Sequence, residues 1–203
     1  MITVENIKTY NIARAIYSSR NPLNSWDKSD SDLEHDIIGE KDLQLARRLF
    51  KGGPEHRKFL RQIFVAMDIT SSHTWWAEFD TYKVGVTRDS CSKMHKIHAK
   101  EFVADDFSHE GLSEVGGKYY DHFEKTLEIL EELRVLFNET HEKKYWRAII
   151  DLLPMGYNLK ATVTMNYENA VNIVRQRTGH KLDEWNEFVK ILTDLPYFSE
   201  ITG

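Results

Sequence analysis

One helical pattern is longer than any other in the sequence and sets the first limit on the fold. After the pair Gly116-Gly117, apolar side chains recur at helical spacing through about residue 138. They form one face, made of Tyr120, Phe123, Leu127, Leu130, Leu133 and Leu136. A second helical segment, KKYWRAIIDLL, follows and ends at Pro154. The sequence therefore predicts two consecutive helices in its second half.

Shorter patterns surround these helices in mixed order. In chain order they predict a strand over 3–10, a helix beginning near 12, an exposed loop over 21–36, a helix over 42–51, a buried strand (or a helix) over 59–69, a serine-capped helix over 71–82, an extended segment over 84–87, a strand over 157–166, and helices over 167–177 and 182–195. There is no repeated βαβ unit and no glycine-rich phosphate loop after a strand. The order therefore favours an α+β fold over a Rossmann fold.

Composition excludes several classes of protein. With 203 residues, 41% hydrophobic and 29% charged, the chain can form one folded domain. The net charge of −5 argues against a protein that coats duplex nucleic acid, although a basic pocket for one phosphate stays possible. The single cysteine, Cys91, excludes an intramolecular disulfide and disfavours a zinc site built from cysteines. The first residues lack the pattern of a signal peptide and no stretch resembles a membrane span, so we expect a cytoplasmic protein without a membrane partner.

Two short motifs invite a chemical interpretation and also have a simpler one. His95-x-x-His98 is the only close histidine pair, and two solvated histidines are favoured over a metal site, so no metal is expected. The lysines around this pair could bind an anion or could be ordinary surface residues. Cys91, with Lys93 nearby, could be an activated thiol, but a small semi-buried residue is the favoured interpretation. Sequence alone leaves these alternatives open.

Aromatic residues gather at 75–82. On a helix, Trp75, Trp76, Phe79 and Tyr82 would form one aromatic face. Core packing is favoured over a stacking platform for an aromatic cofactor.

The most informative segment runs from 153 to 185. Its strand ends in Thr164-x-Asn166, and the next helix can place Asn169, Asn172 and Gln176 on one stripe, with Arg177 at its end. Amides and a forked guanidinium suit the carbonyl and imide edges of a heterocycle and a phosphate. The segment is therefore the best candidate for a binding site, with an ordinary polar helix as the alternative.

The same segment resembles the C-terminal signature of the flavin-dependent thymidylate synthases, the thymidylate-synthase-complementing proteins. Leu153-Pro154, Thr164-x-Asn166, Asn172, Arg177 and Trp185 keep the order of that signature. Upstream, GGPEH resembles the helix-end motif with its histidine, His56, and ARAIYSS resembles A-A-R-x-S. Residues 81–94, TYKVGVTRDSCSKM, are the best counterpart of the family motif R-H-R-x-x-S-x-N-E-x-S-x-R-Y. There Lys83, Asp89, Cys91 and Lys93 replace Arg, Glu, Ser and Arg, and Thr81 and Tyr82 replace the first Arg and the His.

The resemblance implies a fold, a reaction and an assembly. The fold is a single α+β domain over residues 1–203, with a central mixed or antiparallel sheet flanked by long helices. The reaction transfers a methylene group from methylenetetrahydrofolate to C5 of dUMP, with FAD as the hydride donor and NADPH as the reductant. The assembly is a homotetramer whose sites are shared between subunits, with no nucleic-acid polymer as a partner.

The resemblance also implies roles for individual residues. Arg177 is the catalytic residue, beside the carbonyl edge of the pyrimidine. The substrate-binding set is Glu78, Asp89, Cys91, Lys93, Arg147 and Arg177, and the cofactor-binding set is Ser19, His56, Tyr82, Lys83, Asn166, Asn172 and His180.

Two other functions stay open at this point. Glu78 falls where the family carries a glutamine, which favours one-carbon transfer to another pyrimidine nucleotide. The replacements at Thr81 and Tyr82 would suit a non-catalytic nucleotide-binding homologue that has lost flavin chemistry.

Overall fold

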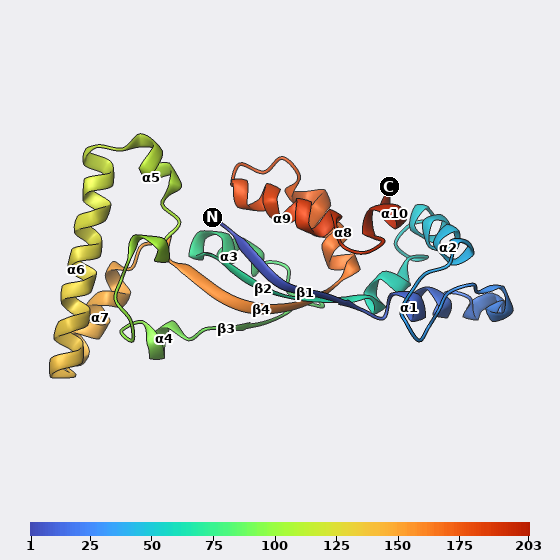
Figure 1. The fold of residues 1–203 in the computed structure, drawn as a ribbon, viewed down its shortest axis with the longest axis horizontal. Helices are drawn as coiled ribbons and strands as arrows, with labels where there is room; N and C mark the ends of the chain where they lie inside the picture. The colour runs from blue at the N-terminus through green and yellow to red at the C-terminus, as the bar shows by residue number, and fades with distance from the viewer. The chain divides into compact units, whose positions relative to one another are not determined.

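The fold is α+β, as the sequence predicts. The computed structural model describes all 203 residues, and its sheet contains four antiparallel strands in the order β1-β2-β4-β3 (Figure 1). The strands are β1 (Thr3–Tyr10), β2 (Phe64–Ser72), β3 (Thr87–Ser90) and β4 (Asn158–Asn166). The antiparallel pairing of β2 and β4 shows in their backbone hydrogen bonds. Tyr167 N–H donates to Ile63 O just before β2, and His73 N–H donates to Tyr157 O just after it.

Backbone contacts divide the chain into two compact units. Unit 1 comprises Met1–Thr3, Thr70–Phe79 and Ser90–Ala161, and unit 2 comprises Val4–Ile69, Asp80–Asp89 and Thr162–Gly203. A single domain over 1–203 therefore stays a prediction. No helix combines the length and apolar character that crossing a membrane requires.

Unit 1 is built around the two consecutive helices that the sequence predicts. The elements of this unit outside the sheet are α3 (His73–Phe79), α4 (Lys93–Lys96), η4 (Ala104–Asp106), α5 (Glu110–Val115), α6 (Lys118–Thr140) and α7 (Lys143–Leu152). Helix α7 packs along α6 (Figure 1). Phe123 and Leu130 of α6 and Ile149 of α7 are buried in one apolar cluster with Phe102 and Phe107. Burial of these faces stabilises the pair, because helices this amphipathic owe most of their stability to packing.

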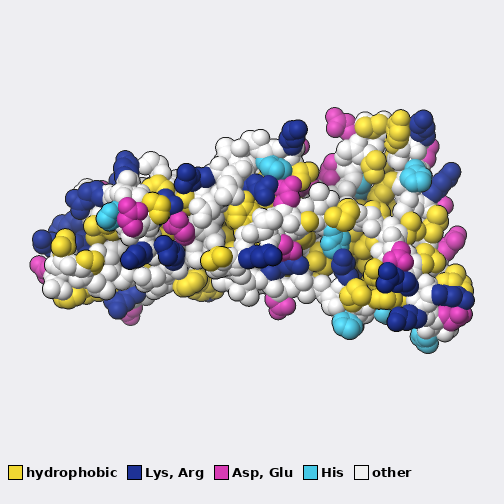
Figure 2. Space-filling view, turned by 180° about the vertical axis from the view of Figure 1, so that it is seen from behind, with side chains coloured by type: hydrophobic (Ala, Val, Ile, Leu, Met, Phe, Trp, Pro, Cys, Tyr) yellow, Lys and Arg dark blue, Asp and Glu magenta, His cyan; other side chains and the backbone are white.

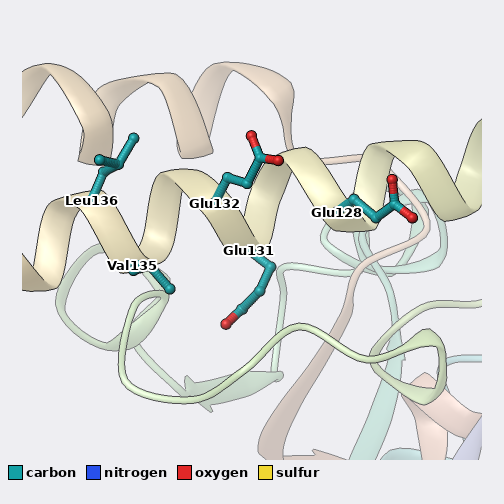
Figure 3. Close-up of a pocket in the computed structure, with 5 residues that line it drawn as sticks. All are labelled: Glu128, Glu131, Glu132, Val135 and Leu136. Atoms are coloured by element: carbon teal, nitrogen blue, oxygen red, sulfur yellow. The ribbon is translucent and has the colours of Figure 1, made fainter.

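The predicted apolar face of α6 is one residue too long. Leu136 is 37% exposed and does not belong to the apolar cluster. It lines a surface groove of about 590 Å³. Figure 3 shows the groove's lining side chains projecting from this one helix: Glu128, Glu131, Glu132, Val135 and Leu136. Hydrogen bonds from Arg134 hold the pKa of the Glu131 carboxyl below its usual range, so this carboxylate stays ionised. Three carboxylates in the lining make the groove unsuitable for a nucleotide phosphate.

The aromatic residues of α3 are core residues. Trp75, Trp76 and Phe79 are at most 2% exposed, and the indole N–H of Trp76 donates to Leu159 O at 2.9 Å. Ser72 Oγ accepts the N–H of Trp75, which confirms the predicted serine cap. Tyr82 is not part of this face, because the helix ends at Phe79. Core packing is thus confirmed for three of the four aromatic residues.

Unit 2 holds the N- and C-terminal helices. Its helical elements are α1 (Ile12–Ser18), η1 (Asn21–Leu23), η2 (Trp26–Lys28), α2 (Glu40–Lys51), η3 (Lys58–Gln62), α8 (Tyr167–Arg177), α9 (Asp183–Thr193) and α10 (Phe198–Thr202). Lys and Arg side chains gather over α1 and α2 (Figure 2), where Arg14, Arg48 and Lys51 are exposed. The chain is acidic overall, but its surface over α1 and α2 is locally basic.

The loop predicted over 21–36 is ordered by buried ionic contacts. Asp42 is fully buried. Its Oδ1 accepts a hydrogen bond from Arg20 Nε at 2.7 Å and also pairs with Arg20 Nη2. The hydroxyls of Ser29 and Ser31 donate to the other oxygen of Asp42 at 2.5 and 2.6 Å. Asp30 accepts the N–H groups of Lys41 and Asp42 and so caps the first turn of α2. These bonds tie the loop to α2.

Four further predictions of local structure and burial are wrong or incomplete. Residues 59–69 are not one strand, because a 3₁₀ turn occupies 58–62 and β2 begins at Phe64. Residues 84–87 are not extended, since Gly85 has φ of +79° and β3 begins only at Thr87. Helix α10 follows Pro196 and was not predicted. Cys91 is exposed rather than semi-buried.

Candidate functional site

The start of α8 fixes the loop over residues 80–86. Asn166 and Asn169 cap the helix reciprocally: Asn166 Oδ1 accepts Asn169 N–H at 3.0 Å, and Asn169 Oδ1 accepts Asn166 N–H at 3.2 Å. The Asn169 side chain then donates from Nδ2 to the carbonyl of Val84 at 2.7 Å. One asparagine therefore caps α8 and also holds a loop 85 residues away in sequence.

Gly85 permits this close approach. Its φ is +79°, and a Cβ placed there would lie 2.7 Å from Asn166 Nδ2 and 3.1 Å from Asn169 Oδ1. Glycine is therefore required for both its backbone conformation and the missing side chain.

We expect Gly85→Ala to lower the free energy of unfolding by at least about 1 kcal/mol more than Gly179→Ala. Gly179 is the matched control because its φ is +73° but a Cβ there would meet nothing within 4 Å. The control variant then incurs only the left-handed strain, about 1 kcal/mol. Urea denaturation measures both values. Equal losses would show that the asparagines yield to the added methyl group and do not clamp the loop.

The clamped loop brings Tyr82 to the C-terminal end of α8. The Tyr82 hydroxyl donates to Gln176 Oε1 at 3.0 Å and accepts from Arg177 Nε at 2.9 Å. Both hydrogen-bonding functions of the phenol are therefore engaged within the chain, and they orient the arginine.

Two aromatic rings flank the Arg177 guanidinium. Its Cζ lies 4.5 Å from the ring centroid of Trp185 and 5.6 Å from that of Tyr82. Trp185 is fully buried at the start of α9, so its ring cannot move aside without opening the core. Such cation–π contacts restrict a side chain that otherwise has many rotamers. Arg177 is thus pre-organised, with its donors held in one direction.

His180 adds a second donor at the same place. Leu182 N–H donates to His180 Nδ1 at 3.1 Å, so the proton of a neutral imidazole belongs on Nε2. That Nε2 lies 3.1 Å from Arg177 Nη1, which is also a donor. Two donors this close together favour an acceptor that lies beside them and within reach of both, such as a carbonyl or phosphate oxygen. The arrangement therefore suits a ligand with an oxygen-bearing edge.

The other predicted residues of unit 2 lie on several elements. Lys83 and Asp89 are exposed on the segment 80–89, and Asn172 is half-buried on α8. His56 is exposed after α2, and half-buried Ser19 closes α1. Of the predicted set, Tyr82, Arg177 and His180 come into direct contact with one another.

Four predicted substrate-binding residues belong to unit 1. Glu78 is half-buried in α3, and half-buried Lys93 begins α4. Cys91 N–H donates to Lys160 O at 3.0 Å, so its backbone pairs with β4 while its thiol is exposed. Arg147 forms an exposed pair with Asp151, with Nε 3.0 Å from Oδ1. No group of three or more His, Cys, Asp or Glu side chains lies where it could hold a metal ion.

Sequence reasoning missed one partner of Arg177, Trp185, and one partner of Tyr82, Gln176. Trp185 appears in the C-terminal signature, and Gln176 appears on the polar stripe, but neither pattern indicates contact with Arg177 or Tyr82. The contacts depend on the turn over 178–182 and on the clamped loop. No local signal reports either arrangement.

Comparison with solved structures identifies the fold. The flavin-dependent thymidylate synthase ThyX from Helicobacter pylori, complexed with FAD and dUMP, matches with a TM-score of 0.70 and 18% identity, covering 99% of this chain and 96% of that one. A second structure of ThyX from the same organism, also with FAD and dUMP, gives a TM-score of 0.69 and 19% identity, covering 99% and 95%. No family model and no curated protein matches the sequence. The likeness confirms, for the fold, the resemblance seen in the sequence.

Proposed function

We propose that this chain, which has the fold of the flavin-dependent thymidylate synthases, is a divergent flavin-dependent enzyme that methylates dUMP or a closely related pyrimidine nucleotide. The observation that carries the proposal is Arg177, held between Tyr82 and Trp185 with its donors beside the Nε2 of His180. The solved neighbours contain FAD and dUMP, which supports both ligands for this chain.

The role of Arg177 follows from its geometry. A guanidinium at the carbonyl edge of a pyrimidine stabilises negative charge on the ring oxygens and so makes C5 more nucleophilic. Tyr82 holds the guanidinium at Nε, and Trp185 holds it from the ring face. His180 Nε2 supplies a second donor toward the same oxygen-bearing edge. The residues on this side of α8 therefore bind and polarise the nucleotide.

The donors of unit 2 fit FAD in chemical type. Exposed Lys83 and His56 and half-buried Ser19 and Asn172 offer a cation, an imidazole, a hydroxyl and an amide, which suit a diphosphate and an imide edge. Asn166 contributes less than the resemblance implies, because its oxygen already accepts Asn169 N–H. When bound, the flavin supplies hydride transfer.

Several finer statements belong to the same proposal. The one-carbon donor is methylenetetrahydrofolate, the reductant is NADPH, and Glu78, Asp89, Cys91, Lys93 and Arg147 contact the nucleotide. The chain assembles as a homotetramer with shared sites in the cytoplasm. Each rests on the resemblance of the motifs at 81–94 and 153–185.

We expect the purified protein to be yellow, with absorbance bands at about 370 and 450 nm from bound flavin. The same preparation, given methylenetetrahydrofolate, NADPH and dUMP, should form dTMP and should rescue a thymidine auxotroph. Parallel assays with dUMP and dCMP identify the nucleotide, because a carboxylate at Glu78 would favour an amino-bearing ring edge. Yellow protein without activity on either nucleotide would exclude the synthase proposal.

One observation favours a second candidate, a nucleotide-binding protein without flavin chemistry. The Tyr82 hydroxyl, at the position of the family's histidine, is already occupied by Gln176 and Arg177. Colourless protein that FAD cannot reconstitute, but that binds dUMP, would support this candidate.

A further inference from the structure

A cavity of about 360 Å³ lies within unit 1, where α4, the end of α6 and the start of α7 meet. This volume is at the lower end of the range for small-molecule sites. Three histidines, one lysine and two aromatic rings line it: His95, His98, His141, Lys143, Phe137 and Trp146. No carboxylate is in the lining. The cavity therefore combines hydrogen-bond donors and positive charge with an aromatic wall.

The histidine pair of α4 is part of this larger group of donors. His95 and His98 line the cavity together with His141, the residue that ends α6. The three imidazoles do not converge on one point, because no group of three such side chains lies where it could hold a metal ion. An imidazole offers at least one N–H donor, whether neutral or protonated. A ligand that reaches all three therefore needs acceptor atoms that lie apart from one another.

The ring of Phe137 intervenes between two of these donors. Its centroid lies 4.8 Å from that of the His98 ring and 6.3 Å from that of the His141 ring, with edge-on geometry in both pairs. No ring contact joins His98 to His141. The donors thus form two groups, His95 with His98 and His141 with Lys143, and an aromatic side chain lies between the groups.

The rest of the fold holds both groups in place. Ile97, next to His98, is buried in the apolar cluster of unit 1, and Asn138 Nδ2 donates to the carbonyl of His98 at 3.2 Å. His141 N–H donates to Phe137 O at 2.8 Å and closes α6. The φ of His141 is +56°, a conformation that glycine adopts with less strain. Strained residues of this kind are concentrated at functional sites.

Lys143 brings a charge that no carboxylate compensates. On the same two turns of α7, Lys144 Nζ lies 2.7 Å from Glu142 Oε2, and Arg147 Nε lies 3.0 Å from Asp151 Oδ1. Lys143 has no such partner, and it is the cation of these three that lines the cavity. An anionic group is therefore the favourable neighbour at this end.

We propose that this cavity binds an aromatic diacid, a small molecule with an anionic group at each end of an aromatic ring. Lys143 and His141 bind one anionic group, and His95 and His98 donate to the other. The ring packs against Phe137 and Trp146, which supply the aromatic wall between the two groups of donors. None of these residues belongs to the Arg177 site or to the contacts proposed above for the nucleotide and FAD.

Isothermal titration at constant ionic strength tests both ends of the ligand separately. The probe 1,4-phenylenediacetate should bind at least about tenfold more tightly than phenylacetate, which lacks one charged hydrogen-bonding group. It should also bind several-fold more tightly than adipate, which has two carboxylates but no ring. Shifts of the His95, His98 and His141 ring signals in NMR spectra locate the binding. Equal affinity for 1,4-phenylenediacetate and phenylacetate would overturn the proposal.

Phenyl phosphate distinguishes a ligand with two separate anionic groups from one with both charges on a single group. We expect it to bind more weakly than 1,4-phenylenediacetate, because its one phosphate reaches only one group of donors. Tighter binding of phenyl phosphate would show that the donors act together on one anion, and would overturn the assignment to a diacid.

Exposed residues of the lining provide variants that leave the core intact. Lys143→Gln should weaken 1,4-phenylenediacetate about tenfold, whereas Lys144→Gln, its matched control outside the lining, should leave the affinity unchanged. His95→Gln should weaken the diacid several-fold, whereas His122→Gln, at an exposed histidine of α6 outside the lining, should not. Wild-type affinity in both Lys143→Gln and His95→Gln would overturn the proposal.

The outcome does not depend on the enzymatic function proposed above. The titrations require neither flavin nor turnover, so a protein without synthase activity still gives a readable result. Displacement of 1,4-phenylenediacetate by FAD or dUMP would assign the cavity to one of those ligands and would overturn the inference of a separate site. Unchanged affinity in the presence of both would support it.

Discussion

Arg177→Ala is expected to lower kcat/KM for the nucleotide by about 100-fold or more, the loss typical of a removed donor that stabilises developing charge. Flavin content should stay near wild type, because the proposed flavin contacts are Ser19, His56, Lys83 and Asn172. Titration of dUMP into the flavin-loaded variant measures the loss of binding, and the flavin absorbance measures retention of the cofactor.

The controls use the same helix and the same site. Arg175→Ala removes an exposed arginine two residues away, on another face of α8, and should leave the nucleotide affinity unchanged. Arg177→Lys keeps the charge but loses Nε, which bonds Tyr82, so it should recover only part of the activity. Unchanged dUMP affinity in Arg177→Ala would remove Arg177 from the binding site. Equal loss of flavin and nucleotide would indicate collapse of the region instead.

Asp42→Ala is expected to lower the free energy of unfolding by about 3–5 kcal/mol, because it leaves Arg20 as a buried charge without its partner. Arg20 is 7% exposed, and Asp42 is fully buried. The hydroxyls of Ser29 and Ser31 lose their acceptor in the same variant. Urea denaturation, with comparison of the slope as well as the midpoint, measures the change.

Asp151→Ala is the matched control for Asp42→Ala. It breaks an exposed arginine–aspartate pair with Arg147 and should cost about 0–1 kcal/mol. A loss below about 1 kcal/mol for Asp42→Ala would show that the loop over 21–36 rearranges to solvate Arg20. The contacts to α2 would then contribute little to its order.

The sequence predicts elements well where the pattern is local. The spacing of apolar residues predicts α6 and α7, and the alternation over 157–166 predicts β4, because side-chain periodicity follows from backbone geometry. Prediction fails where the decisive contact is distant. The turn over 84–86 depends on Asn169, which donates to Val84 O from another part of the chain. β-branched residues such as Val84 and Val86 favour strands, but this tertiary contact overrides the preference.

In the candidate site, too, the sequence predicts what is local and misses the contacts that depend on distant residues. Residue type alone singles out Arg177, since a guanidinium among amides at the end of a helix suits a heterocycle or a phosphate. The contacts that orient it come from Tyr82 and Trp185, and only the folded chain brings these residues together. The resemblance gives Tyr82 a cofactor role, whereas the structure shows it bound to Gln176 and Arg177.

The reciprocal cap limits the insertions and deletions that α8 can accept. Helix α8 contacts the loop over 80–86 at two places: Asn169 bonds Val84, and Gln176 and Arg177 bond Tyr82. The number of residues between these two places sets the distance along the helix axis and the rotation about it that separate the two contacts. One inserted residue would move Arg177 by about 1.5 Å along the axis and rotate it by about 100°. Tyr82, anchored through its own loop, could not follow. Insertions and deletions in this part of α8 are therefore incompatible with the site, even where substitutions on its surface are harmless.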